Sequence, residues 1–241
     1  MMVPSRKIFP RPSAVLILLF LAAAGCGDQA AEETAAGPAP VPAGVTDFNR
    51  LVERDGTVYE IGSDRPFTGR AVSRYEGGGK EWEGEYRGGR RHGRWTYWYP
   101  GGAKKSEVDY REGREDGKVL EWYENGGKKL EAERRDGRPH WKAVRWNEEG
   151  RKIMETGWRD GVLHGKATLW YDNGRVMLES EYRQGKEHGR WFTWYENGRM
   201  KSEENWREGK RHGRSVRWTP SGLREREEFW EDGVLVGPSS S

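Results

Sequence analysis

Histidine is the residue type in this chain best suited to metal binding or acid–base catalysis, and its copies recur in one regular column. They are His92, His140, His164, His188 and His212. Metal-binding histidines must converge on one ion, each about 2 Å from it. Equivalent residues two strands apart in a sheet lie about 9.5 Å from one another. We therefore predict a role in the turns of a repeated structure rather than a metal or catalytic site.

Other catalytic signatures are absent from the sequence. It contains no G-x-S-x-G nucleophile motif, no G-x-x-x-x-G-K-[ST] phosphate loop and no CxxC pair. Paired carboxylates such as Glu203 and Glu204 recur without one unique pair. The visible breaks in the pattern, Arg74, Arg134 and Trp141, supply neither a nucleophile nor a base. The sequence predicts a protein that is not an enzyme and that binds no cofactor or metal.

The pattern that these residues interrupt is a repeat of 24 residues. Counting from Gly69 in that step reaches a glycine at every position up to Gly237 except Trp141, and we call this position offset 0 of each unit. Glycine also stands at +9 and +20, Glu at +14, and Lys or Arg at +1 in all seven units. Such strict periodicity predicts equivalent units in a regular stack.

Each unit reads as one β-hairpin. Offsets +1 to +6 alternate as in "RWTYWY" (94–99), +7 to +9 carry turn signals such as "ENG", and +10 to +18 form a second strand. We assign the stretch from +19 to the next offset 0, such as "EGKRHG" (208–213), to the return loop. Three fixed glycines per unit exclude an amphipathic helix. The prediction is an all-β fold, an elongated, twisted antiparallel meander of stacked 24-residue hairpins over 69–237.

Two aromatic columns become ladders in this meander, as candidates for the core or for a binding surface. The +5 ladder is Trp98, Trp122, Trp146, Trp170, Trp194 and Trp218, and the +17 ladder is Tyr86, Tyr110, Trp158, Tyr182, Trp206 and Trp230. We predict that the face with +3 and +5 is the buried one and that the other face carries much of the charge. We expect the +14 Glu to pair with cations of adjacent strands. The sequence does not show whether the turn at +7 to +9 has two or three residues, so the cross-strand register stays open.

The amino terminus has the pattern of an export signal. Basic residues precede the apolar run "AVLILLFLAAAG" (14–25), which is short for a membrane span and predicts a signal peptide over 1–25. The ending "AAGC" resembles a bacterial lipobox, which implies cleavage before Cys26 and acylation of that residue. Gly27 lacks the Asp that would retain a lipoprotein at the inner membrane, so the resemblance implies the periplasmic face of the outer membrane in a Gram-negative host. A cleaved signal with an incidental cysteine is the alternative.

The remaining segments flank the repeats. Residues 26–46 read as a flexible Ala/Pro/Gly-rich tether, 47–68 as an off-register capping hairpin, and 238–241 as a disordered tail. Loss of residues 1–25 removes three cations, so 39 Lys and Arg would face 39 Asp and Glu in the mature chain. This balance argues against a nucleic-acid partner, which requires a basic excess.

The repeats resemble a known family. The stretch "YRGGRRHGRWTYWYPGG" (86–102) resembles the MORN repeat, whose hairpins stack into an elongated sheet. The 24-residue unit, and the lead-in "DRPFTG" (64–69), are more similar to a bacterial MORN-variant family with some members labelled YwqK-type antitoxins. The likeness covers roughly residues 50–237. It implies the repeat fold, and the label implies an antitoxin or immunity role.

Three functions follow as hypotheses. The first is a membrane-anchored scaffold that binds another protein at the cell envelope, since exposed aromatic residues beside Arg supply binding hot spots. The second is glycan or cell-wall binding, with Trp and Tyr stacked on sugars. The third is the antitoxin or immunity role. In each of them the membrane contact is the acyl chains on Cys26.

Overall fold

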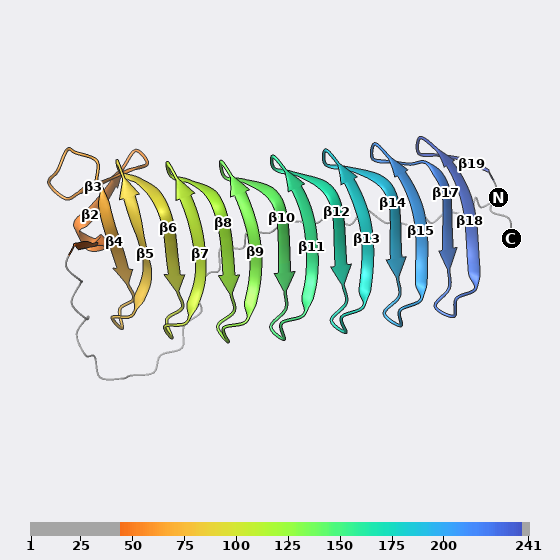
Figure 1. Cartoon of the computed structure of the whole chain (residues 1–241), viewed down its shortest axis with the longest axis horizontal. Helices are drawn as coiled ribbons and strands as arrows, with labels where there is room; N and C mark the ends of the chain where they lie inside the picture. The colour runs from red at the N-terminus through yellow and green to blue at the C-terminus, as the bar shows by residue number, and fades with distance from the viewer. Residues whose placement is uncertain (1–43, 238–241) are drawn as a thin grey trace, which may run out of the picture. The chain divides into compact units, whose positions relative to one another are not determined.

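The computed structural model describes residues 44–237, and this range is almost entirely β-structure (Figure 1). The predicted signal peptide, Cys26, most of the tether and the tail lie outside the described residues. Besides the short 3₁₀ helix η1 (Phe48–Arg50), the described elements are β1 (Val45–Asp47), β2 (Leu51–Arg54), β3 (Thr57–Glu60), β4 (Gly69–Arg74), β5 (Lys80–Arg87), β6 (Arg90–Trp98), β7 (Lys104–Arg111), β8 (Arg114–Trp122), β9 (Lys128–Arg135), β10 (Arg138–Trp146), β11 (Lys152–Arg159), β12 (Val162–Trp170), β13 (Val176–Arg183), β14 (Lys186–Trp194), β15 (Met200–Arg207), β16 (Lys210–Arg211), β17 (Gly213–Trp218), β18 (Arg224–Glu231) and β19 (Val234–Gly237).

From β4 onward the sheet is a meander in chain order. Each strand pairs antiparallel with the next, and β16 and β17 are two segments that both pair with β15. Figure 1 shows these strands side by side from orange to blue. β1 adds a parallel strand to β4, with Val45 opposite Arg70, so the sheet is mixed. The predicted all-β stack of hairpins is confirmed. Between residues 44 and 237, no helix is both long and apolar enough for a membrane crossing.

The tight turns lie at offsets +19 and +20. Glu112 and Gly113 have φ values of 50° and 83°, which is the backbone of a type I′ turn, and Arg111 pairs with Arg114 on either side of it. Glycine recurs at +20 because this turn requires positive φ. The predicted return loop from +19 to the next offset 0 is therefore wrong: its last four residues already belong to the next strand, as in β6.

The opposite turns have three residues, which decides the register that the sequence left open. The amide of Gly102 donates to the oxygen of Tyr99 at 2.8 Å, and the amide of Tyr99 donates to the oxygen of Ala103 at 2.8 Å. Gly102 has φ 84°, as in a type I turn closed by a residue in the left-handed region. Thr96 at +3 consequently lies opposite Glu107 at +14.

This register corrects the prediction of which face is buried. Because cross-strand partners share a face, the +3 and +5 side chains lie on the same face as the +14 Glu; we call this the charged face. Most buried apolar residues instead occupy the opposite, core face, at +2, +13, +15 and +17. They include Ala71, Trp95, Val119, Ala143, Ala167, Leu130, Met154, Leu178, Val108, Ala132, Tyr86 and Tyr182. The +3 column contributes Val72, Val144 and Val216 to the buried set.

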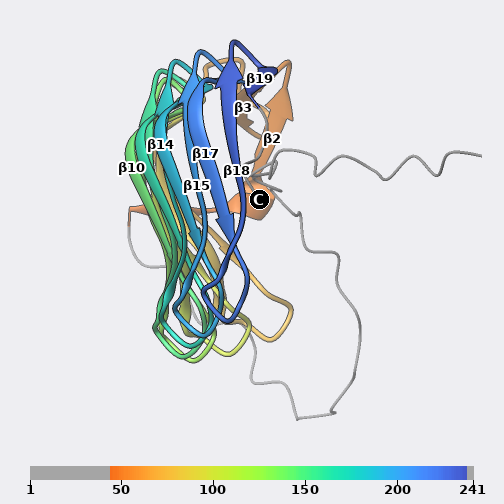
Figure 2. The same cartoon turned by 90° about the vertical axis from the view of Figure 1, so that its right-hand side faces the viewer.

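A separate hairpin precedes the repeats, within the segment that we expected to form a cap. β2 and β3 pair with each other around Asp55 and Gly56, and Tyr59 of β3 also bridges to Pro66. Leu51 and Val58 of this hairpin form a buried cluster with Ala71, Tyr86 and Trp95. Figure 2 shows β2 and β3 beside one face of the sheet, and these contacts identify it as the core face.

Candidate binding site

The +5 Trp ladder lies half-buried on the charged face. In the first units, a Lys at +11 of the preceding unit covers each indole. The Lys80 Nζ lies 5.3 Å from the Trp98 ring, and the Lys104 Nζ lies 5.2 Å from the Trp122 ring. These indoles thus hold neighbouring units together through cation–π contacts, which leaves little of their ring surface for a ligand.

The +17 ladder lies on the core face. Tyr86 and Tyr182 are buried, while Tyr110, Trp158, Trp206 and Trp230 are partly buried. Trp206 packs against Trp191 with ring centroids 5.4 Å apart. Burial raises the pKa of Tyr182 to about 12, because the phenolate would lose its hydration there. These contacts show that the +17 ladder packs within the core face.

A third aromatic column, at +6, was not recognised from the sequence. The hydroxyl of Tyr99 donates to the main-chain oxygen of Trp122 at 2.9 Å, one unit further on. Tyr75, Tyr123, Tyr171 and Tyr195 make the equivalent bond at 2.8 Å. The recurrence of Tyr at +6 was the available signal. Unit four interrupts the series, because Asn147 stands at this offset.

Three of the five histidines, His140, His164 and His212, contact main-chain amides of the tight turns, whereas Nδ1 of His92 and of His188 has no hydrogen-bond partner in the described structure. The main-chain amides of Asp160 and Gln184 approach Nδ1 of His140 and His164, each at 3.4 Å, from the tight turn of the following hairpin. Among the described residues, no group of three or more His, Cys, Asp or Glu side chains is arranged to hold a metal ion.

Five of the seven +14 Glu residues pair with cations, whereas Glu179 and Glu203 form no ion pair among the described residues. Glu155 lies 2.5 Å from the Nζ of Lys142 at +1 and 3.1 Å from the Nζ of Lys152 at +11. Burial raises the pKa of Glu155, but the hydrogen bonds from the two lysines outweigh this largest influence and hold the pKa below its ordinary value. Glu83, Glu107 and Glu227 have two cations in the same way.

Shallow hollows lie on the charged face between the +1 cations of successive units. In unit one, Arg70 and Arg94 line such a hollow together with Glu83 and Glu85. In unit five, Lys166 and Arg190 line the equivalent hollow together with Glu179 and Glu181. Two cations and two carboxylates therefore balance in each. The second carboxylate of each set, Glu85 or Glu181, stands at +16.

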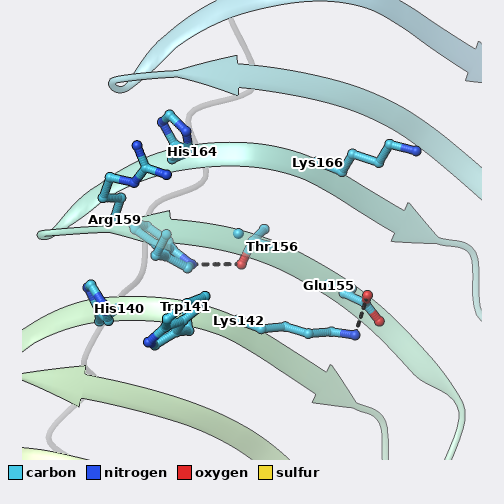
Figure 3. A pocket seen from close by; sticks show the side chains of 10 residues that line it. His140, Trp141, Lys142, Glu155, Thr156, Arg159, His164 and Lys166 are labelled. Carbon is cyan, nitrogen blue, oxygen red and sulfur yellow. Dashed lines mark hydrogen bonds and ion pairs between the residues drawn. The ribbon is translucent and has the colours of Figure 1, made fainter.

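The hollow of unit four departs from this balance. Its volume is about 400 Å³, and it is lined by Lys142, Glu155, Gly157 and Lys166 at the repeated positions. Glycine at +16 removes one carboxylate. Figure 3 shows that the hollow also extends toward the tight turns, where Trp141, His140, Arg159 and His164 lie. Three permanent cations and one carboxylate line it, which leaves an excess of positive charge.

Trp141 replaces the repeat glycine beside this hollow. It has φ 63°, in the left-handed region, and the side chain is 64% exposed. Its ring meets that of His140 edge to face, with centroids 5.5 Å apart. A large indole in a conformation that glycine adopts freely, and with so little of its surface buried, contributes little to the fold.

Gly157 is required where it stands. A Cβ at this position would overlap the main-chain oxygen of His164 on the adjacent strand. The missing carboxylate was overlooked in the sequence, although +16 is acidic in four of the seven units, as Glu85, Asp109, Glu133 and Glu181; units six and seven have Asn205 and Phe229 there. Of the three breaks noticed in the sequence, Arg134 pairs with Glu115 at 3.4 Å and Arg74 donates to the oxygen of Gly78 at 3.1 Å. Of the three breaks, Trp141 is the one that lines the hollow of unit four.

Comparison with protein families agrees with the hairpin units. Three segments, 91–112, 163–184 and 187–208, match the MORN repeat variant family. Each spans two strands around a three-residue turn, β6 and β7 in the first case. No curated protein matches the chain. Three of the seven hairpin repeats thus match the MORN repeat variant family by sequence.

Proposed function

We propose that this protein is a lipid-anchored, non-catalytic scaffold that binds another protein at the bacterial cell envelope. Export through residues 1–25 and acylation of Cys26 would place the repeats on the periplasmic face of the outer membrane in a Gram-negative host. This part of the proposal rests on the lipobox-like sequence. The neutral charge of the mature chain favours acyl chains over surface electrostatics as the membrane contact.

The observation that carries the proposal is the exposed indole of Trp141 beside an excess of cations. Trp and Arg are the residue types most enriched at binding hot spots. MORN repeats are in general modules for protein or membrane interaction. The hollow also lacks the arrangement that catalysis requires: the hydroxyl of Thr156 is buried and accepts a 2.8 Å bond from Trp158 rather than facing a base.

Photo-crosslinking in cells tests the scaffold function. Trp141 is replaced by p-benzoylphenylalanine, and adducts are identified by mass spectrometry. We expect one dominant protein adduct that is absent when the probe replaces Leu223, which is equally exposed but lies far along the sheet. The absence of any protein adduct at Trp141 would contradict the proposal. In the same cells Cys26→Ser should release the protein from membranes, and unchanged membrane association would refute lipidation.

Glycan binding is the second candidate, and the same residue favours it. An exposed indole face can stack on a sugar ring, as aromatic side chains do in many binding sites. Retention of the purified protein on peptidoglycan, lost in Trp141→Gly, would support this function over protein binding. Retention that does not depend on Trp141 would assign cell-wall binding to another surface.

A further inference from the structure

We propose that the hollow of unit four binds an acidic peptide segment of the partner, with one carboxylate held by Lys166, a second carboxylate held by Arg159 at the other end of the hollow, and an apolar side chain between them against Trp141 (Figure 3). This inference deepens the proposed function and rests on it. Nothing in the family matches assigns a ligand to this hollow.

Charge is the first argument. The equivalent hollows of units one and five each place two carboxylates against two cations. In unit four, Gly157 stands in place of the +16 carboxylate, and Arg159, at an offset that is Arg in units one to six, lines the hollow together with Lys142, Lys166 and Glu155. Lys166 also borders the unit-five hollow, but among the described residues no ion pair joins it to Glu179 or Glu181. An anionic ligand would supply the negative charge that Glu85 and Glu181 provide in the hollows of units one and five. It would bind beside Gly157, where the main-chain oxygen of His164 leaves no room for a side chain of the protein itself.

The available hydrogen-bonding groups give the second argument. Lys142 is already bound to Glu155, and the Thr156 hydroxyl to Trp158. Within the described part of the chain, Lys166 and Arg159 have neither an ion pair nor a side-chain hydrogen bond. Both groups are donors only, since an ammonium and a guanidinium have no acceptor. Carboxylates satisfy such donors, whereas sugar hydroxyls need acceptors as well, which favours an acidic peptide over a neutral glycan.

The indole gives the third argument. Trp141 stands at the edge of the hollow and exposes most of its surface. An apolar or aromatic side chain between the two carboxylates would cover this ring and exclude water from the ion pairs, which strengthens them. The hollow's volume of about 400 Å³ lies in the lower part of the range of ligand pockets, roughly 300 to 1,000 Å³. It therefore suits a few side chains and not a whole domain.

Peptide binding by the purified full-length protein tests the assignment directly. The probes are fluorescein-labelled peptides with alternating Glu and Phe, their Gln–Phe and Lys–Phe counterparts, and an oligogalacturonate, and binding is followed by fluorescence anisotropy. We expect the Glu–Phe peptide to bind at least about tenfold more tightly than the Gln–Phe peptide, with affinity falling as salt increases. Equal binding of the Glu and Gln peptides, or preference for the oligogalacturonate, would overturn the assignment.

Variants locate the binding. Trp141→Gly should lower the affinity by about tenfold or more, and Trp141→Phe should restore much of it. Lys166→Gln should lower it about three- to fivefold, the effect of one exposed ion pair. The matched control is Lys118→Gln at the same offset of unit three, which should leave the affinity within about twofold. If Lys118→Gln weakens binding as much as Lys166→Gln does, the charged face binds nonspecifically and the hollow is not the site.

The two proposals fail separately. A protein crosslinked in cells through position 141 without any preference for the acidic peptide would leave the scaffold function standing and remove the acidic ligand. Selective peptide binding without a cellular protein adduct would instead keep the acidic-peptide preference of the hollow and remove the scaffold function.

Discussion

The hydroxyl of Tyr123 donates a 2.8 Å hydrogen bond to the main-chain oxygen of Trp146, one unit further along the sheet. This bond adds a side-chain link to the strand pairing between units. Tyr123→Phe should lower the free energy of unfolding by about 1 kcal/mol, because the acceptor loses its partner while the ring remains. Urea denaturation followed by circular dichroism measures the change.

Tyr59 provides the control for that substitution. Its ring contacts Arg54, and its hydroxyl has no hydrogen bond among the described residues. Tyr59→Phe should therefore change the unfolding free energy by less than about 0.5 kcal/mol. Equal effects of the two substitutions would mean that the Tyr123 hydroxyl adds nothing between units.

Gly84 lies against the most deeply buried indole of the core face. A Cβ there would overlap the ring of Trp95, whose side chain is 1% exposed and held by a 3.1 Å hydrogen bond from its Nε1 to the oxygen of Glu85. Gly84→Ala should destabilise the protein by about 1 to 3 kcal/mol through overpacking. Gly77→Ala is the matched control, because a Cβ there meets open space and the backbone does not require glycine. Thermal unfolding of both variants distinguishes overpacking from a general loss on replacing glycine.

Trp141→Gly should have an unusually small effect on stability. Loss of a buried Trp typically costs about 3 to 5 kcal/mol. At position 141 the side chain is mostly exposed, and glycine relieves the left-handed strain, worth about 1 to 2 kcal/mol, against its own entropy cost of about 0.5 to 1 kcal/mol. We expect a change within about 1 kcal/mol, whereas Trp95→Ala should show the full core cost. A loss at Trp141 as large as that at Trp95 would give the exposed indole a structural role.

Acid should destabilise the sheet through the +14 carboxylates. Hydrogen bonds from lysine hold the pKa values of Glu131 and Glu155 below the ordinary 4.5. A depressed folded pKa stabilises the protein above the unfolded pKa, and this stabilisation is lost as the pH falls through the folded value. Melting temperature should thus stay level from pH 7 to about 5.5 and fall below about 4.5.

Glu155→Gln tests the origin of this acid sensitivity. The variant should be less stable at neutral pH and should lose less stability than the wild type between about pH 5 and 3. Glu149→Gln is the control, since Glu149 has no ion pair in the described structure. An acid profile unchanged by Glu155→Gln would place the titrating groups elsewhere.

The sequence predicted the hairpins because glycine marks both turns of every unit. The type I′ turn at Glu112 and Gly113 and the three-residue turn ending at Gly102 each need positive φ, so the glycine positions marked both turns, although the tight turn is shorter than the predicted loop. The buried face was mistaken because both faces carry large side chains: Trp98 at +5 on one and Trp95 at +2 on the other. Alternation cannot choose between two such faces. The three-residue turn determines which face is buried, because it sets Thr96 opposite Glu107.

The candidate site was half visible in the sequence. Trp141 stood out as a break in the glycine column, but its exposure depends on the bulge at offset 0, where the pairing skips from His140 to Ala143. Gly157 gives no signal by itself, because glycine is common in this chain. Its meaning appears only when the acidic +16 column is aligned and the +1 cations of neighbouring strands are brought to either side of it.

Because no insertion interrupts the 24-residue period, the number of units sets the distance along the sheet. Each unit adds two strands, or about 9.5 Å, between the β2–β3 hairpin and whatever lies beyond it. Since every hairpin presents the same edges to its neighbours, removal or duplication of one 24-residue unit between that hairpin and Trp141 would shift the hollow by one such step and leave its chemistry intact. Relatives that differ by whole units would then differ in reach, with the recognition element itself unchanged.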